Sequence, residues 1–305
     1  MPPRFRPTRP LGRTGFVATA IGAGDLADRS VPKERCVATL RRGLDAGVNV
    51  VDTAPMYEDG YSEEIVGEAL RGRRDGVFLV DKIDHLDRPV SEQLDESLGR
   101  LGLPGVDLLV FHGVSDVAAW RKLEARAGGM AEVGEEIARG RARFRGISSH
   151  HPEVLDLALA SSLCDVVMFP IGPFCDPRYV LEILPRARAL GVGTICFKAF
   201  GAGKLLGDTE GYGRPLPRRP RGKVSAPRLL RLSVEECVRY TLTCDPDVAL
   251  LGLSLPSEQD AAFAAAEAFA PMSSAEMAET RRRAAHAVEG KGAVWWDPPR
   301  AARGA

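Results

Sequence analysis

The 305-residue chain is predicted to fold as an α/β protein, a (β/α)8 TIM barrel with one further helix packed outside it near the C-terminal end. Three observations predict this fold. Eight short apolar runs alternate with segments of helical periodicity, and eight parallel strands close a barrel. Several runs are almost continuous in Val, Leu, Ile or Phe, as strands buried on both faces are. Glycine often ends a helical segment just before the next run, as at Gly47, Gly102 and Gly191.

The apolar runs define the expected strands, and the periodic segments between them define the expected helices. The strands are expected at residues 17–21, 48–51, 77–80, 106–111, 144–147, 166–169, 192–197 and 248–251. Helices are expected at 32–46, 62–70, 131–139, 152–161, 179–190, 233–243 and 257–269, with an outer helix at 275–288. A further helix should begin with Ser91 as its N-cap, because Leu94, Leu98 and Leu101 follow at helical spacing.

A doubly wound open sheet is the structural alternative, and it is the weaker one. Such sheets often carry a G-x-G-x-x-G motif after the first strand, and residues 22–27, Gly-Ala-Gly-Asp-Leu-Ala, match it only in part. We therefore expect one barrel domain spanning residues 1–305, with a long basic loop at about 201–232.

Charge and composition exclude several classes of function. The chain has 41 basic and 41 acidic residues, so its formal net charge is zero, and general binding to nucleic acid or to anionic membranes is disfavoured. One segment departs from this balance: between Gly211 and Val234 lie seven basic residues, four prolines and no acidic residue. No apolar stretch is long enough to span a membrane, and the six cysteines show no C-x-x-C spacing. A cytoplasmic protein with reduced, buried cysteines is expected.

Ionisable side chains stand where several predicted strands end. The second strand runs into Asp52, the third into Lys82 and the fourth into His112, while Tyr57 follows the second strand. In a β/α barrel, the strand ends and the loops that follow them form the active site. Lys82 is notable because the 41 basic residues are seven lysines and 34 arginines, so lysine is the rarer choice in this chain.

These four side chains suit the protonation of an oxygen atom on which negative charge develops. A tyrosine with a reference pKa of about 10 donates a proton poorly at neutral pH, and a neighbouring ammonium lowers that pKa. A carboxylate beside the ammonium offsets the cost of burying it, and a neutral imidazole can orient a carbonyl oxygen by a hydrogen bond. The combination matches carbonyl reduction with Tyr57 as general acid and a cofactor that supplies hydride.

At this point the sequence resembles the aldo-keto reductase family. The resemblance spans about residues 9 to 270 and rests on Leu-Gly-Arg-Thr-Gly at 11–15, Gly-Val-Asn-Val-Val-Asp-Thr-Ala-Pro-Met-Tyr at 47–57, Ser-Glu-Glu-Ile-Val-Gly-Glu-Ala-Leu at 62–70, Asp-Lys at 81–82, Asp-Leu-Leu-Val-Phe-His-Gly at 107–113, Gly-Ile-Ser-Ser-His at 146–150 and Lys-Ala-Phe-Gly-Ala-Gly at 198–203. It implies a β/α barrel that uses NADPH, or alternatively NADH, on a small-molecule carbonyl substrate. It also implies that Asp52, Tyr57, Lys82 and His112 form a catalytic tetrad.

The resemblance implies a cofactor site whose positions only partly match the family. Ser148 stands where a side chain binds the nicotinamide carboxamide, and Ser149 replaces the usual Asn. Met168 and Ile171 replace the Gln and the ring-stacking Tyr of the family, for which Phe174 and Tyr179 are candidate substitutes. Contacts to the pyrophosphate are expected from the loop after the seventh strand and from the segment after the eighth. Lys198 and Gln259 complete the predicted cofactor-binding set, whose remaining members are Gly201, Gly203, Lys204, Gly252 and Ser254.

The choice of cofactor and of reaction stays open at the level of sequence. Leu253 and Leu255 stand where members that select NADPH often carry Lys or Arg. Two alternatives to a reductase remain: a nucleotide-binding regulatory or partner subunit with little turnover, and a Schiff-base lyase that uses Lys198 or Lys82. Trp120, Trp295 and Trp296 are candidates for lining the substrate pocket, although external packing is as plausible for Trp120.

Overall fold

The computed structural model of the chain describes residues 5, 8–25, 28–216, 230–252 and 256–297. Eight parallel strands close into a barrel, in agreement with the predicted fold class. Around the barrel the order is β12-β3-β4-β5-β6-β7-β8-β9, so each strand pairs with its neighbours in the sequence and β12 closes against β3. The strands are β3 (Ile21–Ala23), β4 (Val50–Asp52), β5 (Phe78–Ile83), β6 (Leu108–Phe111), β7 (Phe144–Ser148), β8 (Val166–Pro170), β9 (Gly193–Phe197) and β12 (Val248–Leu251).

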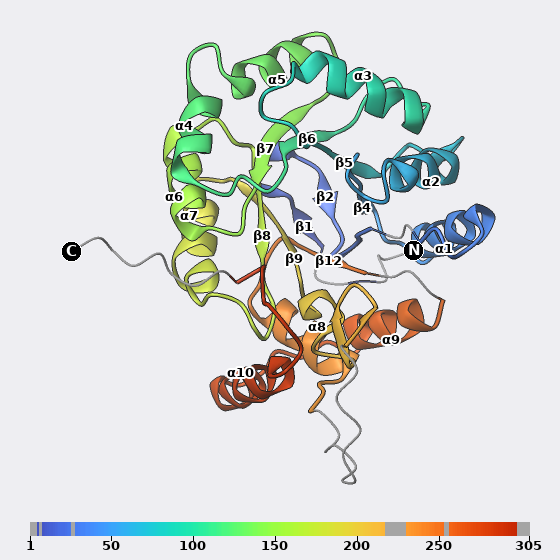
Figure 1. Cartoon of the computed structure of the whole chain (residues 1–305), viewed down its shortest axis with the longest axis vertical. Helices are drawn as coiled ribbons and strands as arrows, with labels where there is room; N and C mark the ends of the chain where they lie inside the picture. The colour runs from blue at the N-terminus through green and yellow to red at the C-terminus, as the bar shows by residue number, and fades with distance from the viewer. Residues whose placement is uncertain (1–4, 6–7, 26–27, 217–229, 253–255, 298–305) are drawn as a thin grey trace.

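Helices form a ring around this barrel (Figure 1). They are α1 (Lys33–Asp45), α2 (Tyr61–Leu70), α3 (Val90–Leu101), α4 (Val117–Glu124), α5 (Gly129–Ala138), α6 (Pro152–Ser161), α7 (Leu184–Ala189), α8 (Val234–Thr243), α9 (Pro256–Glu267) and α10 (Ser274–Val288). A π-helical turn at Tyr179–Ile183 precedes α7. The outer helix α10 packs beside α8 and buries Ala284 and Ala287, as expected for the additional C-terminal helix.

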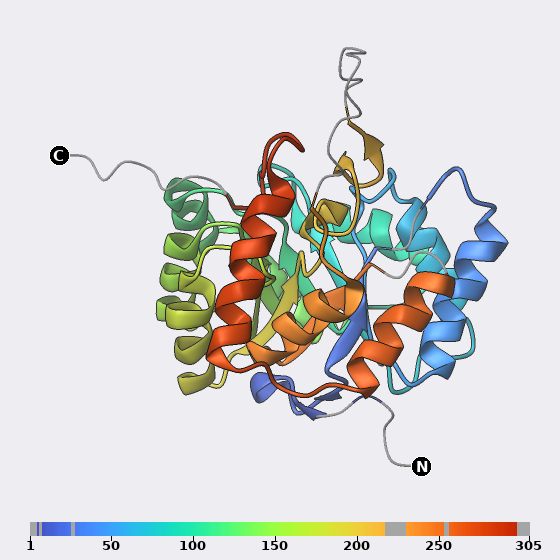
Figure 2. The same ribbon diagram turned by 90° about the horizontal axis from the view of Figure 1, so that it is seen from below.

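The apolar run at 17–21 is not one strand. Val17–Ala18 forms β2, which pairs with β1 (Arg9–Pro10) in a hairpin, and the barrel strand β3 starts only at Ile21. Leu11 and Ala18 are buried among the residues that fill the barrel, so the hairpin closes its N-terminal end. Gly12 has a φ of +49°, and a Cβ there would lie 2.1 Å from the backbone nitrogen of Gly193, so only glycine fits. Figure 2 shows this hairpin at one end of the barrel and the short hairpin β10 (Thr209–Gly211) and β11 (Arg214–Pro215) at the other.

Helix starts follow the sequence signals in some places and not in others. Ser233 and Ser273 cap α8 and α10, each in a capping box with a glutamate three residues later. The expectation that Ser91 caps α3 is wrong, because the helix already begins at Val90 after Pro89, and Ser91 lies within its first turn. Proline fixes a φ suited to a helix start, so Pro89 displaces the predicted boundary by two residues.

The barrel strands place alternate side chains inside the barrel and outside it. The inner set includes Val50, Val80, Val110 and Met168, and it forms a core distinct from the one between strands and helices. All six cysteines are buried and free, as expected. Within the described part of the chain, no helix is both long and apolar enough to span a bilayer.

Candidate active site

Strand periodicity brings the predicted catalytic residues together at the C-terminal end of the barrel. Asp52 ends β4 two residues after the inward-facing Val50, and Lys82 follows the inward-facing Val80 on β5. His112 directly follows β6, again two residues after an inward-facing valine. Side chains two apart on a strand share a face, so all three polar groups point to the barrel opening. Because this end of a β/α barrel carries the active site, we take it as the candidate site.

Lys82 is held by two strong acceptors. Its ammonium Nζ lies 2.6 Å from Asp52 Oδ1 and 2.7 Å from the carbonyl oxygen of Thr53. Side chains of Lys82 and Asp52 are 2% and 4% exposed, so the pair is out of contact with bulk water. Opposite charges in hydrogen-bond contact compensate one another where neither is hydrated. The pair therefore fixes one positive charge at the inner edge of the opening.

Tyr57 lies over this pair, on the loop between β4 and α2. Its Oη donates a hydrogen bond to Asp52 Oδ2 at 3.4 Å, and Lys82 Nζ lies 4.4 Å from the centre of its ring. The loop turns sharply after Tyr57, since Glu58, Asp59 and Gly60 all have positive φ.

The electrostatics of Tyr57 differ from the expectation. Burial raises the pKa of Tyr57 well above its ordinary value, and the negative charge of Asp52 raises it further. The ammonium of Lys82 contacts the face of the ring and is bonded to Asp52 and Thr53, so its charge is already balanced by Asp52. In this arrangement the phenol keeps its proton at neutral pH.

His112 lies beside Tyr57, and its ring nitrogen Nδ1 contacts a carboxylate. The two rings meet edge to face with their centres 5.6 Å apart. His112 Nδ1 lies 2.5 Å from Oδ1 of Asp84, a residue that the sequence analysis did not single out. Burial lowers the pKa of His112, which outweighs the opposite effect of the Asp84 carboxylate, so the imidazole is neutral at neutral pH. Asp84 lies two residues after Lys82, so the rule that strand ends carry the site could have found it.

The predicted carboxamide and ring-binding positions occupy β7 and β8. Ser148 is buried, and its Oγ accepts a hydrogen bond from the Gly113 N–H at 2.8 Å. Ser149 is turned away, since its hydroxyl donates to the carbonyl of Val114 at 2.7 Å. Met168 is buried among the side chains that fill the barrel, and Ile171 belongs to the core outside it. Of these four residues, Ser148 has the placement that suits a carboxamide contact.

Neither proposed replacement for the stacking tyrosine faces the opening. Tyr179 is fully buried and stacks on Phe169, and Phe174 packs into the outer core. An aromatic side chain that does lie at the opening on this side is Phe197, which ends β9 and packs against the interior of the barrel. Sequence reasoning missed it because it sought the aromatic residue after the sixth strand instead of at the end of the seventh.

Phe197 belongs to a group of side chains on the β7 and β9 side of the opening. His150 meets Phe197 edge to face at 5.3 Å, and Lys198 Nζ lies 5.6 Å from the centre of its ring. The Lys198 ammonium also hydrogen-bonds the hydroxyl of Tyr212, whose side chain is otherwise largely exposed. Burial and the charge of Lys198 lower the pKa of His150 to about 4. Lys198 thus lies at the opening, where a cofactor contact was predicted.

The loop after β9 does not offer the phosphate contacts expected of it. The backbone N–H groups of Gly201, Gly203 and Lys204 donate to the carbonyls of Lys198, Phe200 and Gly201. The Lys204 ammonium is fully buried and donates to the carbonyls of Lys291 at 2.7 Å and Ala293 at 2.6 Å. Its charge therefore secures the C-terminal segment, which corrects the expectation that this side chain contacts a pyrophosphate.

The segment after β12 is described only in part. Gly252 is exposed, Ser254 lies outside the described residues, and so does the stretch 217–229 of the basic loop. Arg231, near the end of that loop, forms an ion pair with Asp208 at 2.7 Å. Gln259 is buried, and its Nε2 donates to the carbonyl of Thr39 on α1 at 2.7 Å, so this hydrogen bond joins two helices.

The three tryptophans divide between core and surface. Trp120 is fully buried on α4, and Trp296 is buried with its Nε1 donating to the carbonyl of Phe174 at 2.9 Å. Trp295 is 42% exposed and packs against Tyr212 with ring centres 5.6 Å apart. Trp295 is therefore the tryptophan placed beside the opening, on the same side as Lys198.

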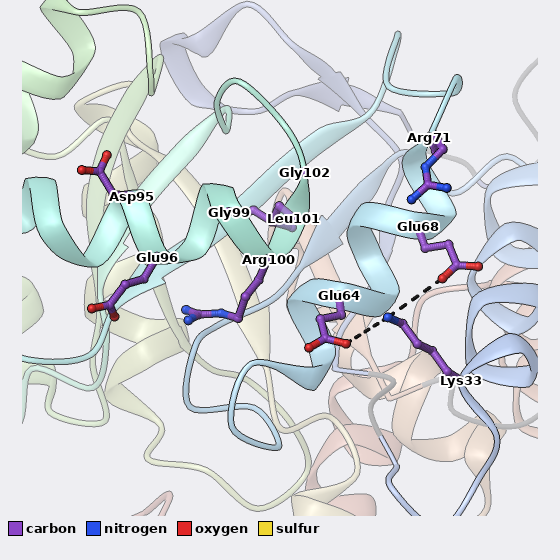
Figure 3. Close-up of a pocket in the computed structure, with 10 residues that line it drawn as sticks. All are labelled: Lys33, Glu64, Glu68, Arg71, Asp95, Glu96, Gly99, Arg100, Leu101 and Gly102. Atoms are coloured by element: carbon purple, nitrogen blue, oxygen red, sulfur yellow. Dashed lines mark hydrogen bonds and ion pairs between the residues drawn. The ribbon is translucent and has the colours of Figure 1, made fainter.

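A pocket also lies on the outer surface, away from the tetrad (Figure 3). It lies between α1, α2 and α3, and Lys33 spans it to reach Glu64 at 2.9 Å and Glu68 at 4.0 Å. Its lining is mostly charged and includes none of the four predicted catalytic residues. Lys33 pairs with the two glutamates across the pocket, while Asp95, Glu96 and Arg100 pair with residues outside its lining, as charges on solvated helix faces do.

Comparison with known proteins agrees with the fold. A family model described as "Aldo/keto reductase family" matches residues 19–280. Aldo-keto reductase YhdN of Bacillus subtilis is 29% identical over 66% of this chain and 65% of its own length. Methylglyoxal reductase YeaE of Escherichia coli is 33% identical over 56% of each protein. The alignments thus span between about half and two thirds of these curated relatives.

Solved structures show the same barrel. An aldo-keto reductase of Bacillus halodurans in its holo form superposes with a TM-score of 0.69, at 22% identity, over 93% of this chain and 96% of that one. An aldo/keto reductase of Klebsiella pneumoniae in complex with NADP and acetate superposes with a TM-score of 0.68, also at 22% identity, over 97% and 98%. With the family match covering nearly the whole barrel, the chain belongs to the aldo/keto reductase family.

Proposed function

We propose that the protein is an NAD(P)H-dependent oxidoreductase that reduces an aldehyde or ketone to an alcohol, or catalyses the reverse reaction. The observation that carries this proposal is the convergence of Tyr57, the Lys82–Asp52 pair and His112 at the C-terminal end of the barrel. Related proteins bear names such as methylglyoxal reductase and L-galactose dehydrogenase, which describe both directions of this chemistry on small molecules. A small-molecule carbonyl or alcohol is therefore the proposed substrate class.

Three members of the tetrad, Tyr57, Lys82 and Asp52, handle the proton in this reaction. A reduced nicotinamide, if held by Ser148, Phe197 and Lys198, would supply the hydride for the carbonyl carbon. Tyr57 gives its proton to the carbonyl oxygen, and its raised pKa keeps that proton in place until charge develops on the substrate. The fixed ammonium of Lys82 stabilises the negative charge that then appears on the phenol oxygen, while Asp52 holds the ammonium in position.

The residues at the opening fit the nicotinamide end of such a cofactor. Ser148 Oγ accepts one hydrogen bond, and within the described part of the chain no acceptor takes its own proton, so it can donate to a carboxamide oxygen. The ring of Phe197 supplies an aromatic surface beside it. Lys198 adds a positive charge on the same side. NADPH is the cofactor that we propose first, and NADH is the alternative.

Replacing Tyr57 by Phe tests the function. The variant keeps the ring that covers Lys82 and removes the proton donor, so turnover of a carbonyl panel should fall by about 10²- to 10⁴-fold. Reduction is followed by the consumption of NADPH. Fluorescence titration with NADPH and with NADH is the control, and cofactor affinity should stay near the wild-type value for whichever cofactor binds.

Other outcomes point to the rival functions. Tight NADPH binding with no reduction of any carbonyl by the wild type would favour the regulatory subunit, and full activity of the Phe variant would contradict the role of Tyr57. A Schiff-base lyase requires an adduct that borohydride traps on Lys82 or Lys198. Nζ of Lys82 is engaged by Asp52 and by the carbonyl of Thr53, which leaves Lys198 as the lysine better placed for such an adduct.

A further inference from the structure

Asp84 contacts two parts of the site at once. Its Oδ1 lies 2.5 Å from Nδ1 of His112, and its Oδ2 accepts the backbone N–H of Met56 at 2.6 Å. The side chain of Asp84 is only 3% exposed. One carboxylate therefore links the histidine after β6 to the residue that directly precedes Tyr57.

The contact with Asp84 determines which nitrogen of His112 carries the proton. An ionised carboxylate only accepts hydrogen bonds, so Nδ1 must be the donor. A neutral imidazole has one N–H, and its other nitrogen is then an acceptor. None of the described residues hydrogen-bonds Nε2, and the His112 side chain is 19% exposed. A lone pair at Nε2 is thus free to face a ligand.

We propose that Asp84 is a positioning residue that holds neutral His112 as the Nδ1–H tautomer and so presents Nε2 to the substrate as a hydrogen-bond acceptor. The inference rests on the proposed oxidoreductase function for its consequences, but not for its test. It changes the role expected for His112, since a neutral ring in this tautomer has no N–H to give to a carbonyl oxygen.

The chemical consequence differs between the two sides of the reaction. Neutral His112 accepts a hydrogen bond from the hydroxyl of an alcohol, whereas a carbonyl oxygen is bound only by the protonated ring, which has an N–H at both nitrogens. Binding of a carbonyl should therefore weaken as His112 loses its proton, while binding of the matching alcohol should not.

The groups around His112 support its neutral form near pH 7. Burial lowers its pKa and the ammonium of Lys82 acts in the same direction, while Asp84 and Asp52 raise it. The remaining titratable neighbours that face it are Tyr57 and His150, from the loop after β4 and from the segment after β7. Most of the protein at neutral pH thus has the tautomer that Asp84 selects.

The contact with Met56 makes one substitution decisive. In Asp84→Asn we expect the amide oxygen to stay at the Oδ2 position, because there it keeps the hydrogen bond from the backbone N–H of Met56. The amide NH₂ then points to His112 Nδ1 and donates to it. This single exchange should move the proton of the neutral ring from Nδ1 to Nε2 with almost no change in shape.

Nitrogen NMR of the protein labelled with ¹⁵N-histidine measures the tautomer directly at pH 7.5, without substrate and without turnover. The signal of His112 is assigned by its loss in His112→Gln. We expect the Nδ1–H form in the wild type and the Nε2–H form in Asp84→Asn. Asp87→Asn makes the same change of charge at an exposed position of the same loop and should leave the wild-type form unchanged.

Two results would overturn the proposal: an Nε2–H tautomer in the wild type, or an Nδ1–H tautomer that survives in Asp84→Asn. The first result can be obtained from the wild-type spectrum alone. The proposal can therefore still be contradicted if the Asp84→Asn variant does not fold. Neither result depends on activity, whereas failure of the proposed function would appear as absent turnover in a protein with the expected spectrum.

Steady-state kinetics as a function of pH then distinguish a positioning role of Asp84 from a purely structural one. In the wild type, KM for a carbonyl should rise by about tenfold per pH unit above the pKa of His112, because only the protonated fraction binds it. In Asp84→Asn this rise should disappear, while kcat keeps its pH profile. A loss of kcat with an unchanged pH dependence of KM would show that Asp84 only supports the fold.

Discussion

Lys82 and Asp81 are neighbours on β5, yet they point to opposite faces and meet opposite conditions. The inward-facing Lys82 has a carboxylate and a carbonyl within 2.7 Å. The outward-facing Asp81 is fully buried; its Oδ1 accepts the N–H of Lys82 at 2.8 Å, but its Oδ2 has no hydrogen-bond partner within the described part of the chain. At the active site the positive charge of Lys82 is compensated by Asp52. On the outer face of β5 the negative charge of Asp81 is removed by protonation.

The surroundings of Asp81 explain that protonation. Burial raises the pKa of Asp81 to about 8, and the charge of Glu63 on α2 raises it as well. Glu63 is itself buried and forms an ion pair with Arg100, a residue that lines the outer pocket of Figure 3. One arginine cannot balance two buried carboxylates, so one of them holds a proton. The two sides of β5 thus show two ways of burying an ionisable group.

Removing Lys82 should have the largest effect. In Lys82→Met the buried carboxylate of Asp52 loses its partner, and an uncompensated buried charge costs about 3–5 kcal/mol of unfolding free energy. Urea denaturation at pH 7 measures this loss, and turnover should disappear as well. Lys33→Met is the matched control, because its lysine pairs with Glu64 at the surface and should change stability by no more than about 1 kcal/mol. Equal effects of the two substitutions would contradict the comparison.

Neutralising Asp81 should increase the unfolding free energy, whereas removing Lys82 should decrease it. Asp81 takes up a proton on folding between its unfolded pKa of about 3.9 and its folded pKa of about 8, so its contribution to stability falls as pH rises through that range. In Asp81→Asn the amide oxygen still accepts the N–H of Lys82, and no proton is needed. The variant should gain on the order of 1–3 kcal/mol at pH 8, where the wild type exposes the full cost of an unsatisfied buried carboxylate.

Thermal unfolding of Asp81→Asn at pH 5, 7 and 8.5 checks this expectation, and the gain should grow with pH. Asp87→Asn, which changes an exposed residue on the following loop, should show no such trend. A stability gain that is the same at all three pH values would show that the proton of Asp81 is not its source.

The sequence predicts the barrel and its strand ends because both depend on local patterns. Apolar runs mark the strands, and the two-residue period places Asp52, Lys82 and His112 on one face. Partners far away in the chain are not visible in such patterns. The sequence predicts that Lys204 contacts the pyrophosphate, but its ammonium binds carbonyls 87 and 89 residues further on. The sequence also predicts a cofactor contact for Gln259, and its amide binds the carbonyl of Thr39.

The charge state of a side chain is harder still to predict than its position. Tyr57 stands where the sequence predicts it, but its pKa is set by burial and by Asp52, while the sequence suggested control by Lys82. Asp84 is easily located in the sequence, two residues after Lys82. Its proposed role depends on what its two carboxylate oxygens contact, His112 Nδ1 and the backbone N–H of Met56, and the sequence does not show these contacts.

Replacing Glu63 by Gln should have the smallest effect on stability and the most specific effect on pH dependence. The substitution removes a charge that raises the pKa of Asp81, but it also removes the anionic partner of Arg100. The two effects oppose each other, so the unfolding free energy at pH 7 should change less than in the other variants. The pKa of Asp81 should fall, because only burial and the more weakly acting charge of Asp52 then oppose its ionisation. In the wild type, the contribution of Asp81 to the unfolding free energy should stop declining near pH 8, its folded-state pKa. In Glu63→Gln that pH should be lower than 8, as measured by urea denaturation from pH 5 to pH 9. If that pH is the same as in the wild type, Glu63 does not act on Asp81, and burial with the charge of Asp52 accounts for the protonated carboxyl behind β5.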